Sequence, residues 1–275
     1  MKNFKKILAI LLVCAMSVTC LSLVGCSSPP NKDWEDIGPK GKLTIGVTIF
    51  EPMNYKDDAG KWIGFETEFA EAVCEILGVD PVFQVIQWKA KETELKAKKI
   101  DCVWNGMTVT PERAEEMDLS QSYMTNRQVL VTLADNVDKY KTADDMGGAN
   151  VVAENGSTGA DIAYGDGMDP FFAKAKYTAV DTQAKALLDV KAGKADVAVV
   201  DYLIAANVMG EGTDFENLVI SPYQTFEDEE YAIALRKNSP DTLKKINDAI
   251  NELIGNGKLQ EIADKYGLGD LLIKG

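Results

Sequence analysis

Short apolar strands alternate with amphipathic helices along this chain, and this alternation constrains the fold more than any other feature of the sequence. Apolar side chains recur at helical spacing between Phe65 and Leu77, and Gly78 directly after them predicts the end of a helix. Strands separated by helices of this length are typical of a parallel sheet in an α/β domain. The predicted elements of this first half are strands at 43–48, 82–86 and 101–104 and helices at 66–77 and 89–98.

The pattern then restarts, which predicts a second α/β lobe. If the end of the chain returns to the first lobe, that lobe is discontinuous and two segments, near 123–128 and 226–231, cross between the lobes. Lobe 1 is then expected at 41–125 plus 230–275, and lobe 2 at 126–229. The later predicted elements are strands at 150–153, 178–180, 197–200 and 231–235 and helices at 159–164, 182–192, 240–254 and 258–266.

The N-terminus has the features of an export signal. Three early lysines precede an apolar stretch that ends in small residues, which is typical of a secretory signal. Residues 23–26, Leu-Val-Gly-Cys, resemble the lipobox of bacterial lipoproteins, in which cleavage falls before a cysteine that carries two acyl chains, enough for durable attachment. A plain signal peptide with a chance cysteine, or an uncleaved anchor, is the alternative. The sequence therefore predicts a signal peptide at 1–25, lipidation of Cys26 and a polar tether at 26–40.

Composition excludes several classes of function. The chain has no histidine, which excludes Ser-His-Asp and Cys-His catalysis and histidine-ligated metals. Its formal net charge of −14 argues against nucleic acid as a partner. After Cys26 only Cys74 and Cys102 remain, and their spacing fits neither a zinc nor a redox motif. We therefore expect no metal and no cofactor, and two buried free thiols, with a disulfide between them as the alternative.

Several short segments, in a fixed order, resemble those of one protein family. The sequence GFETEFAEAVC at 64–74 resembles the signature of the extracellular solute-binding proteins of family 3, which serve polar amino-acid ABC importers. The resemblance covers 43–267 and implies a periplasmic-binding-protein fold of type II, in which two hinged α/β lobes enclose a cleft. The further segments that agree in order and spacing are 52–55, 101–113, 156–159, 193–201, 231–237 and 257–267.

This resemblance places ligand-binding residues in both lobes. A free amino acid presents an α-carboxylate and an α-ammonium, so its receptor needs a fixed cation and a fixed anion. Arg113 can offer a planar pair of donors to the carboxylate, and Asp201 would bind the ammonium. The 156–159 turn precedes a helix and favours an anion, so Ser157 and Thr158 would close on the carboxylate. The other predicted ligand-binding residues are Phe50, Trp88, Asn105, Gly106 and Thr108.

Each of these positions also has a purely structural interpretation. Arg113 could be an exposed arginine in the first turn of a helix, and Asp201 could cap the helix that follows it. Phe50 and Trp88 occupy the aromatic positions that sandwich the ligand's side chain in this family, but they could be core aromatics. The 156–159 turn could be an ordinary loop.

The expected ligand depends on three positions around the pocket. Val47 stands where family members that bind cationic side chains carry an aspartate, which argues against lysine, arginine and histidine. Glu154 and Asn105 are expected at the side-chain end of the pocket, where Glu154 could receive a positive or amide group or else point to solvent. These positions favour a neutral polar ligand such as glutamine, or cystine with its second zwitterionic end.

The resemblance implies a monomeric, non-enzymatic receptor that captures a free amino acid by hinge closure. Such a receptor delivers the ligand to the permease subunits of an ABC importer, and Cys26 would anchor it on the extracytoplasmic face of the membrane. Two other classes stay open. The fold also hosts dehydratases of prephenate-like acids, for which Glu154 is the only candidate acid or base here. It also hosts ligand-sensing modules, which normally continue into a transmembrane helix.

Overall fold

The computed structural model describes residues 30–165 and 167–273, and it confirms the predicted alternation of strands and helices. The predicted signal peptide and Cys26 lie outside the described residues. The first half contains the strands β1 (Lys42–Val47), β2 (Tyr55–Lys56), β3 (Trp62–Ile63), β4 (Asp80–Val85), β5 (Cys102–Thr108) and β6 (Met117–Leu119), and the helices α3 (Phe65–Leu77), α4 (Lys91–Lys96) and α5 (Pro111–Glu116). The second half contains the strands β8 (Asn150–Glu154), β9 (Lys176–Val180), β10 (Val197–Asp201) and β11 (Leu218–Ile220), and the helices α6 (Thr158–Ala163), α7 (Gln183–Lys191) and α8 (Tyr202–Val208).

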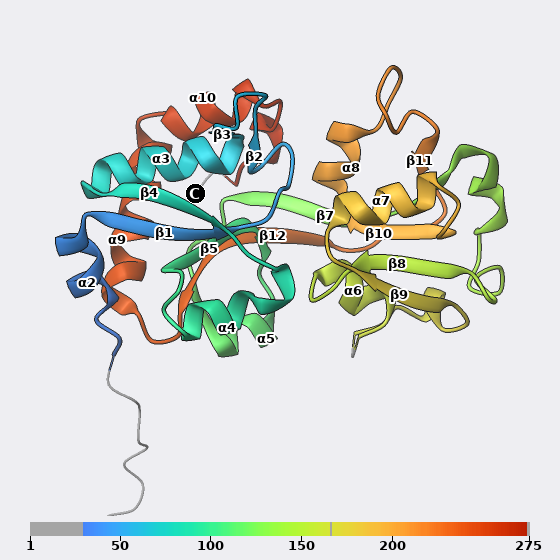
Figure 1. The fold of residues 1–275 in the computed structure, drawn as a ribbon, viewed down its shortest axis with the longest axis horizontal. Coiled ribbons are helices and arrows are strands. Elements are labelled where there is room, and N and C mark those ends of the chain that lie inside the picture. Colours follow the sequence, from blue (N-terminus) through green and yellow to red (C-terminus); the bar gives the residue numbers. More distant parts are fainter. Residues whose placement is uncertain (1–29, 166, 274–275) are drawn as a thin grey trace, which may run out of the picture. The chain divides into compact units, whose positions relative to one another are not determined.

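Two long strands connect these halves. β7 (Met124–Leu133) pairs antiparallel with both β10 and β12 (Asp228–Arg236), and β12 pairs antiparallel with β5. The strand order is therefore β4-β1-β5-β12-β7-β10-β8-β9, in which β1, β4 and β5 are parallel at one end and β8, β9 and β10 at the other. We call the β1–β4–β5 end with its helices lobe 1 and the β8–β9–β10 end with its helices lobe 2 (Figure 1). Both predicted crossing segments are thus paired strands.

The end of the chain packs on lobe 1. Helices α9 (Pro240–Gly255) and α10 (Lys258–Lys265) contact each other and α3. One predicted helix is shorter than expected. Instead of a helix at 89–98, a 3₁₀ turn at Trp88–Ala90 leads into α4. β5 is longer than predicted because it continues as a fully buried strand beside β12.

The predicted tether is too long at its C-terminal end. Residues 26–40 were expected to be a polar linker, but Asp33–Lys40 form helix α2, in which Asp33 and Ile37 are buried. The guanidinium of Arg236 donates from Nε to Oδ2 of Asp33 at 2.9 Å, and the Ser239 hydroxyl donates to the same oxygen at 2.8 Å. The sequence could not reveal this helix because its anchoring partners lie about two hundred residues away.

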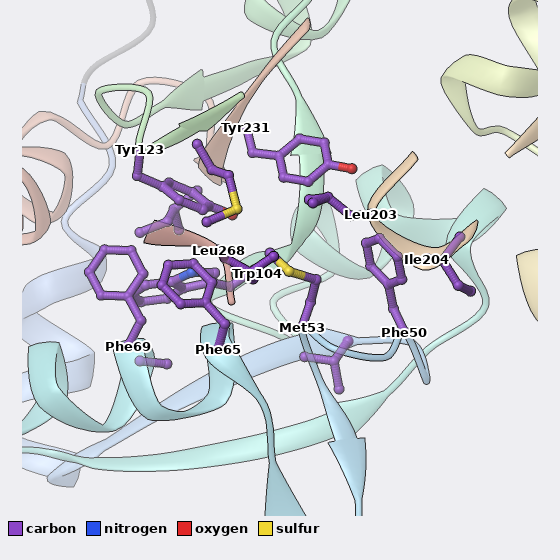
Figure 2. Close-up of a cluster of buried hydrophobic side chains, with 14 of the residues drawn as sticks. Phe50, Met53, Phe65, Phe69, Trp104, Tyr123, Leu203, Ile204, Tyr231 and Leu268 are labelled. Carbon is purple, nitrogen blue, oxygen red and sulfur yellow. The ribbon is translucent and has the colours of Figure 1, made fainter. Parts of the chain in front are cut away.

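An aromatic cluster fills lobe 1 and reaches the boundary between the lobes (Figure 2). Phe69 contacts Trp104 edge-on, with ring centroids 4.8 Å apart, and also meets Tyr123 at 5.4 Å. The same cluster includes Phe50 of lobe 1 and Ile204 of α8 in lobe 2, both labelled in Figure 2. This packing places the ring of Phe50 where the two lobes meet.

Both cysteines of the described chain are buried and free, as the first interpretation predicted. Burial raises the pKa of the Cys74 thiol to about 12, so it stays protonated and unreactive. Within 30–165 and 167–273, no helix combines the length and apolarity that crossing a bilayer demands.

Candidate functional site

A cavity lies where the two lobes meet, with about 380 Å³ of space that includes its open mouth. All nine predicted ligand-binding residues line it, although they come from distant parts of the chain. Lobe 1 supplies the segment after β1, the start of the 3₁₀ turn, the end of β5 and α5, and lobe 2 supplies the start of α6 and the end of β10. Glu154, which was expected at the side-chain end of the pocket, also lines the cavity. Four further residues that were not predicted line it as well: Thr48, Ile49, Gln128 and Gln183.

Arg113 supplies a buried cation. Thr110 begins α5 as its N-cap, and its hydroxyl accepts the Arg113 backbone N–H at 3.2 Å, which fixes the first turn of the helix. The guanidinium Nη1 donates to the carbonyl of Thr108 at 2.9 Å. Only 8 % of the residue is exposed, so the interpretation as an exposed first-turn arginine is wrong. No ion pair neutralises Arg113 within the described residues, which leaves its remaining donors available to an anion.

The α6 turn faces this cation from lobe 2. Ser157 is the N-cap of α6, and its hydroxyl oxygen accepts the Ala160 N–H at 3.1 Å, which leaves its O–H able to donate. The Thr158 hydroxyl oxygen is buried and has no hydrogen-bond partner in the described part of the chain. α6 is only six residues long, so its dipole contributes little. Both hydroxyl groups of this turn can therefore donate to an anion, and that of Thr158 has no other partner among the described residues.

Asp201 supplies the anion at the end of β10. Its Oδ1 accepts hydrogen bonds from Asn126 at 2.6 Å, from Gln128 at 2.8 Å and from the Tyr231 hydroxyl at 2.7 Å. Gln183 donates to Oδ2 and accepts the Asp201 N–H at 2.8 Å. Asp201 stands at the N-cap position of α8 but its side chain makes no capping hydrogen bond, so the capping interpretation is wrong. Its carboxylate is instead held toward the cavity by both crossing strands.

A second carboxyl group shares the partners of Asp201. Glu229 on β12 accepts hydrogen bonds from Asn126 at 2.5 Å and from Gln128 at 2.9 Å. Burial, together with the charge of Asp201, raises the pKa of Glu229 to about 8, so Glu229 is largely protonated at neutral pH. No sequence pattern signals this network, since its members come from β7, α7, β10 and β12.

Gly106 lies where β5 passes under Phe50. Its φ is +59°, and a Cβ there would lie 2.6 Å from the Phe50 ring, so only glycine fits. The buried carboxylate of Glu66 accepts the Gly106 N–H at 2.9 Å and a hydrogen bond from the Tyr123 hydroxyl. Burial raises the pKa of Glu66 to about 7 although both hydrogen bonds oppose the shift. Phe50 itself belongs both to the core cluster and to the lining of the cavity.

Asn105 lines the cavity, but its amide is already bonded within lobe 1. Its carbonyl oxygen accepts the backbone N–H of Thr48 at 2.9 Å and the Thr48 hydroxyl at 2.7 Å, and its amide nitrogen donates to the Thr48 carbonyl at 3.1 Å. Asn105 thus fixes the segment that carries Thr48 and Phe50. Its expected contact with the ligand's side chain would be indirect.

The expectation that Val47 disfavours ligands with a cationic side chain is wrong. Val47 is fully buried in β1, pairs with Val85 and does not line the cavity. Side chains alternate between the two faces of a strand, so Thr48, one residue later, lines the cavity instead. Whether Val47 or Thr48 lines the cavity depends on a shift of one residue, and the sequence alone could not decide between the two positions.

Among the described residues, Glu154 is the one acidic residue besides Asp201 that lines the cavity. It is 4 % exposed, so the alternative in which it points to solvent is wrong. Burial, with the nearby charge of Asp201, raises the pKa of Glu154 to about 8. Its Oε1 has no hydrogen-bond partner among the described residues.

Comparisons with known proteins agree with this architecture. The sequence profile of the bacterial extracellular solute-binding proteins, family 3, matches residues 43–269. The L-cystine-binding protein TcyJ of Escherichia coli (strain K12) is 29% identical over 94% of this chain and 92% of its own length, and the arginine-binding extracellular protein ArtP of Bacillus subtilis (strain 168) is 28% identical over 95% and 98%.

Solved structures give the same result. An ABC transporter substrate-binding protein from Streptococcus pneumoniae with bound histidine has a TM-score of 0.79 at 33% identity and covers 89% of this chain and 99% of that one. An ancestral amino acid-binding protein, described as a precursor of cyclohexadienyl dehydratase, has a TM-score of 0.75 at 28% identity, with 86% and 99% covered. The fold is thus the two-lobed periplasmic-binding-protein fold.

Proposed function

Since the chain belongs to the bacterial extracellular solute-binding proteins of family 3, we propose that it is the receptor that captures a free amino acid for an ABC importer. One observation supports this most strongly. The same cavity holds Arg113, a buried cation that makes no ion pair with any described residue, and Asp201, a carboxylate held by four neighbouring side chains. A zwitterion that binds Arg113 and Thr158 with its carboxylate and Asp201 with its ammonium would provide a partner of opposite charge for both Arg113 and Asp201.

The proposed ligand has a polar side chain, with cystine and glutamine as first candidates. Relatives are named for binding L-cystine and arginine, and a solved structure holds histidine. Because Val47 no longer argues against cationic ligands, arginine, lysine and histidine belong in the same test. Isothermal titration against the twenty amino acids and cystine should find at least one ligand at micromolar affinity or tighter, about 8 kcal/mol of binding free energy. No binding to any of them would overturn the proposal.

The named relatives are amino-acid-binding proteins, and the chain is a binding protein rather than an enzyme. Glu154 is the residue that could serve a dehydratase as general acid, and prephenate and arogenate are therefore the substrates for a control incubation. We expect neither phenylpyruvate nor phenylalanine to form.

Closure of the lobes about β7 and β12 is the proposed means of capture, and Gly156 is where the lobes approach closely. A Cβ at Gly156 would lie 3.1 Å from the Lys89 Cα, and Lys91 of lobe 1 donates to the Gly156 carbonyl at 3.0 Å. Gly156→Ala should therefore weaken ligand binding by about tenfold, because it disfavours the closed form. Titration calorimetry measures this loss.

Gly212→Ala is the matched control for this variant. Gly212 has φ +79°, close to the +77° of Gly156, but has open space around its Cβ position. Both variants carry the same backbone strain, so a similar loss of affinity in both would show that strain, and not the approach of the lobes, is responsible.

The proposed location is the extracytoplasmic face of the membrane, with the lipid on Cys26 as the anchor. Cys26→Ser should move the protein from the membrane fraction to the soluble fraction of the host cell and abolish incorporation of labelled palmitate. Its ligand affinity should stay unchanged, since Cys26 precedes the folded lobes. Retention of the variant in the membrane fraction would argue for an uncleaved signal instead of a lipid anchor.

A further inference from the structure

Building on the proposed function, we propose that Glu154 selects the ligand by its side chain and favours side chains that carry nitrogen-bound hydrogen donors. The chemical class comprises amides, guanidinium groups and ammonium groups, including the second ammonium of cystine. Arg113 and Asp201 would recognise what all amino acids share, and Glu154 would distinguish among them.

The fold places Glu154 next to the anion of the proposed zwitterion site. Glu154 ends β8, which runs parallel to β10, and Asp201 ends β10. The carboxyl ends of neighbouring parallel strands meet at one edge of a sheet, so both carboxyl groups reach the same cavity from lobe 2. The backbone of Glu154 is fixed by β9, where Val180 is its partner. Its position is therefore set by the sheet rather than by a loop.

The Glu154 side chain lacks the partner that its burial demands. A buried oxygen that gives up its hydrogen bonds to water without gaining another destabilises the folded protein. Lys91 is the cation whose charge favours ionisation of Glu154. Lys91 is, however, already paired with Glu92 at 3.0 Å and donates to the Gly156 carbonyl. Within the described chain, Oε1 is thus a buried acceptor without a hydrogen-bond partner, on a residue that lines the cavity. A hydrogen-bond donor on the ligand's side chain would give Oε1 the partner that it lacks.

The charges around Glu154 decide which side chains fit. Asp201 on β10 and Asp181 after β9 disfavour its ionisation, and Lys91 on α4 favours it. An acidic ligand side chain would add a further negative charge to this group, and an apolar side chain would leave Oε1 without a partner. A cationic side chain would favour the ionised carboxylate and so displace the proton that Glu154 holds near neutral pH.

Two substitutions of Glu154 test the proposal. Glu154→Leu should weaken binding of ligands with nitrogen donors in the side chain by about 10- to 100-fold and should improve the relative affinity for leucine and methionine. Glu154→Gln keeps the shape and one acceptor oxygen, so it should retain amide ligands and lose cationic ones. Asn155→Ala, at the exposed neighbour, should change neither affinity nor rank order.

Calorimetry with glutamine, cystine, arginine, lysine, histidine, glutamate and leucine measures all of these changes. If Glu154→Leu binds the seven ligands in the same order as the original chain, the selector role is wrong while the receptor function stands. If the original chain binds no amino acid, the receptor function fails and this inference fails with it.

A measurement on the unsubstituted protein covers the case in which the variants do not fold. Titration near pH 7 in phosphate and in Tris, which differ in ionisation enthalpy, measures the protons released on binding. The ammonium on Asp201 also acts on the neighbouring Glu229 with every ligand, so the test is a difference: a ligand with a cationic side chain should release about one proton more than leucine or glutamine. A tightly binding cationic ligand that releases no more protons than leucine or glutamine would overturn the proposal.

Discussion

Replacing Arg113 by alanine should weaken binding of the amino-acid ligand by about a hundredfold or more. The guanidinium is buried, its charge has no ion pair in the described chain, and its remaining donors line the cavity. Removing one partner of a buried, hydrogen-bonded charge pair costs about 2–5 kcal/mol of binding free energy. The free protein should lose little stability, because the substitution removes a buried cation that no carboxylate compensates. Titration calorimetry and thermal unfolding measure the two effects separately.

Two variants make this result specific. Arg113→Lys keeps the positive charge but loses the planar pair of donors, so its affinity should fall by about tenfold, between those of the original chain and Arg113→Ala. Glu115→Ala changes an exposed residue of the same helix and should leave affinity unchanged. Unchanged affinity in Arg113→Ala would mean that the carboxylate binds elsewhere.

The sequence predicted the elements whose periodicity is strong. The helices at 66–77 and 240–254 and the alternating strands appear within a few residues of their predicted bounds, because each buries one continuous apolar face. Helix α2 escaped prediction because Arg236, not periodicity, holds it. The same reason applies to the network around Asp201, whose members meet only after β7 and β12 have paired.

The ligand-binding residues were predictable as a set but not in their individual contacts. All nine line one cavity, yet the amide of Asn105 is bonded within the protein, and the hydroxyl oxygen of Ser157 accepts a helix N–H and keeps only its O–H for a ligand. A motif can indicate which residues approach a ligand, but only packing decides which of their atoms stay free. Glu154 was expected at the side-chain end of the pocket, but no sequence pattern encodes that its Oε1 lacks a partner among the described residues.

Replacing Arg236 by methionine should destabilise the protein by about 3–5 kcal/mol, because removal of one member of a buried ion pair leaves the other uncompensated. Arg236 is 6 % exposed and reaches Asp33 at 2.9 Å and Asp101 at 3.4 Å. Its Nη1 also donates to the carbonyls of Leu95 at 3.0 Å and Ile100 at 2.6 Å. The loss should lower the melting temperature by about 10 °C in a chain of this size.

The pH dependence gives a second measurement of the same interaction. Burial opposes ionisation of Asp33, but hydrogen bonds from Arg236 and Ser239 and the charges of Arg236 and Lys98 hold its pKa below the ordinary value. A carboxyl group whose pKa is lowered by folding stabilises the folded state above its unfolded pKa, near 4, and this stabilisation is lost as the pH falls through the folded pKa. Arg236→Met should therefore flatten the acid limb of the stability curve.

Arg236→Met and Arg113→Ala should then have opposite consequences, although each removes one buried arginine. Arg236 is paired and does not line the cavity, so its loss should lower the melting temperature and leave ligand affinity unchanged at temperatures where the protein is folded. Lys32→Ala, which breaks an exposed pair with Glu35, should leave the melting temperature as it is. If Arg236→Met melts like the original chain, the Asp33 contact does not hold α2 to the lobe, and the folded part of the chain would begin at β1.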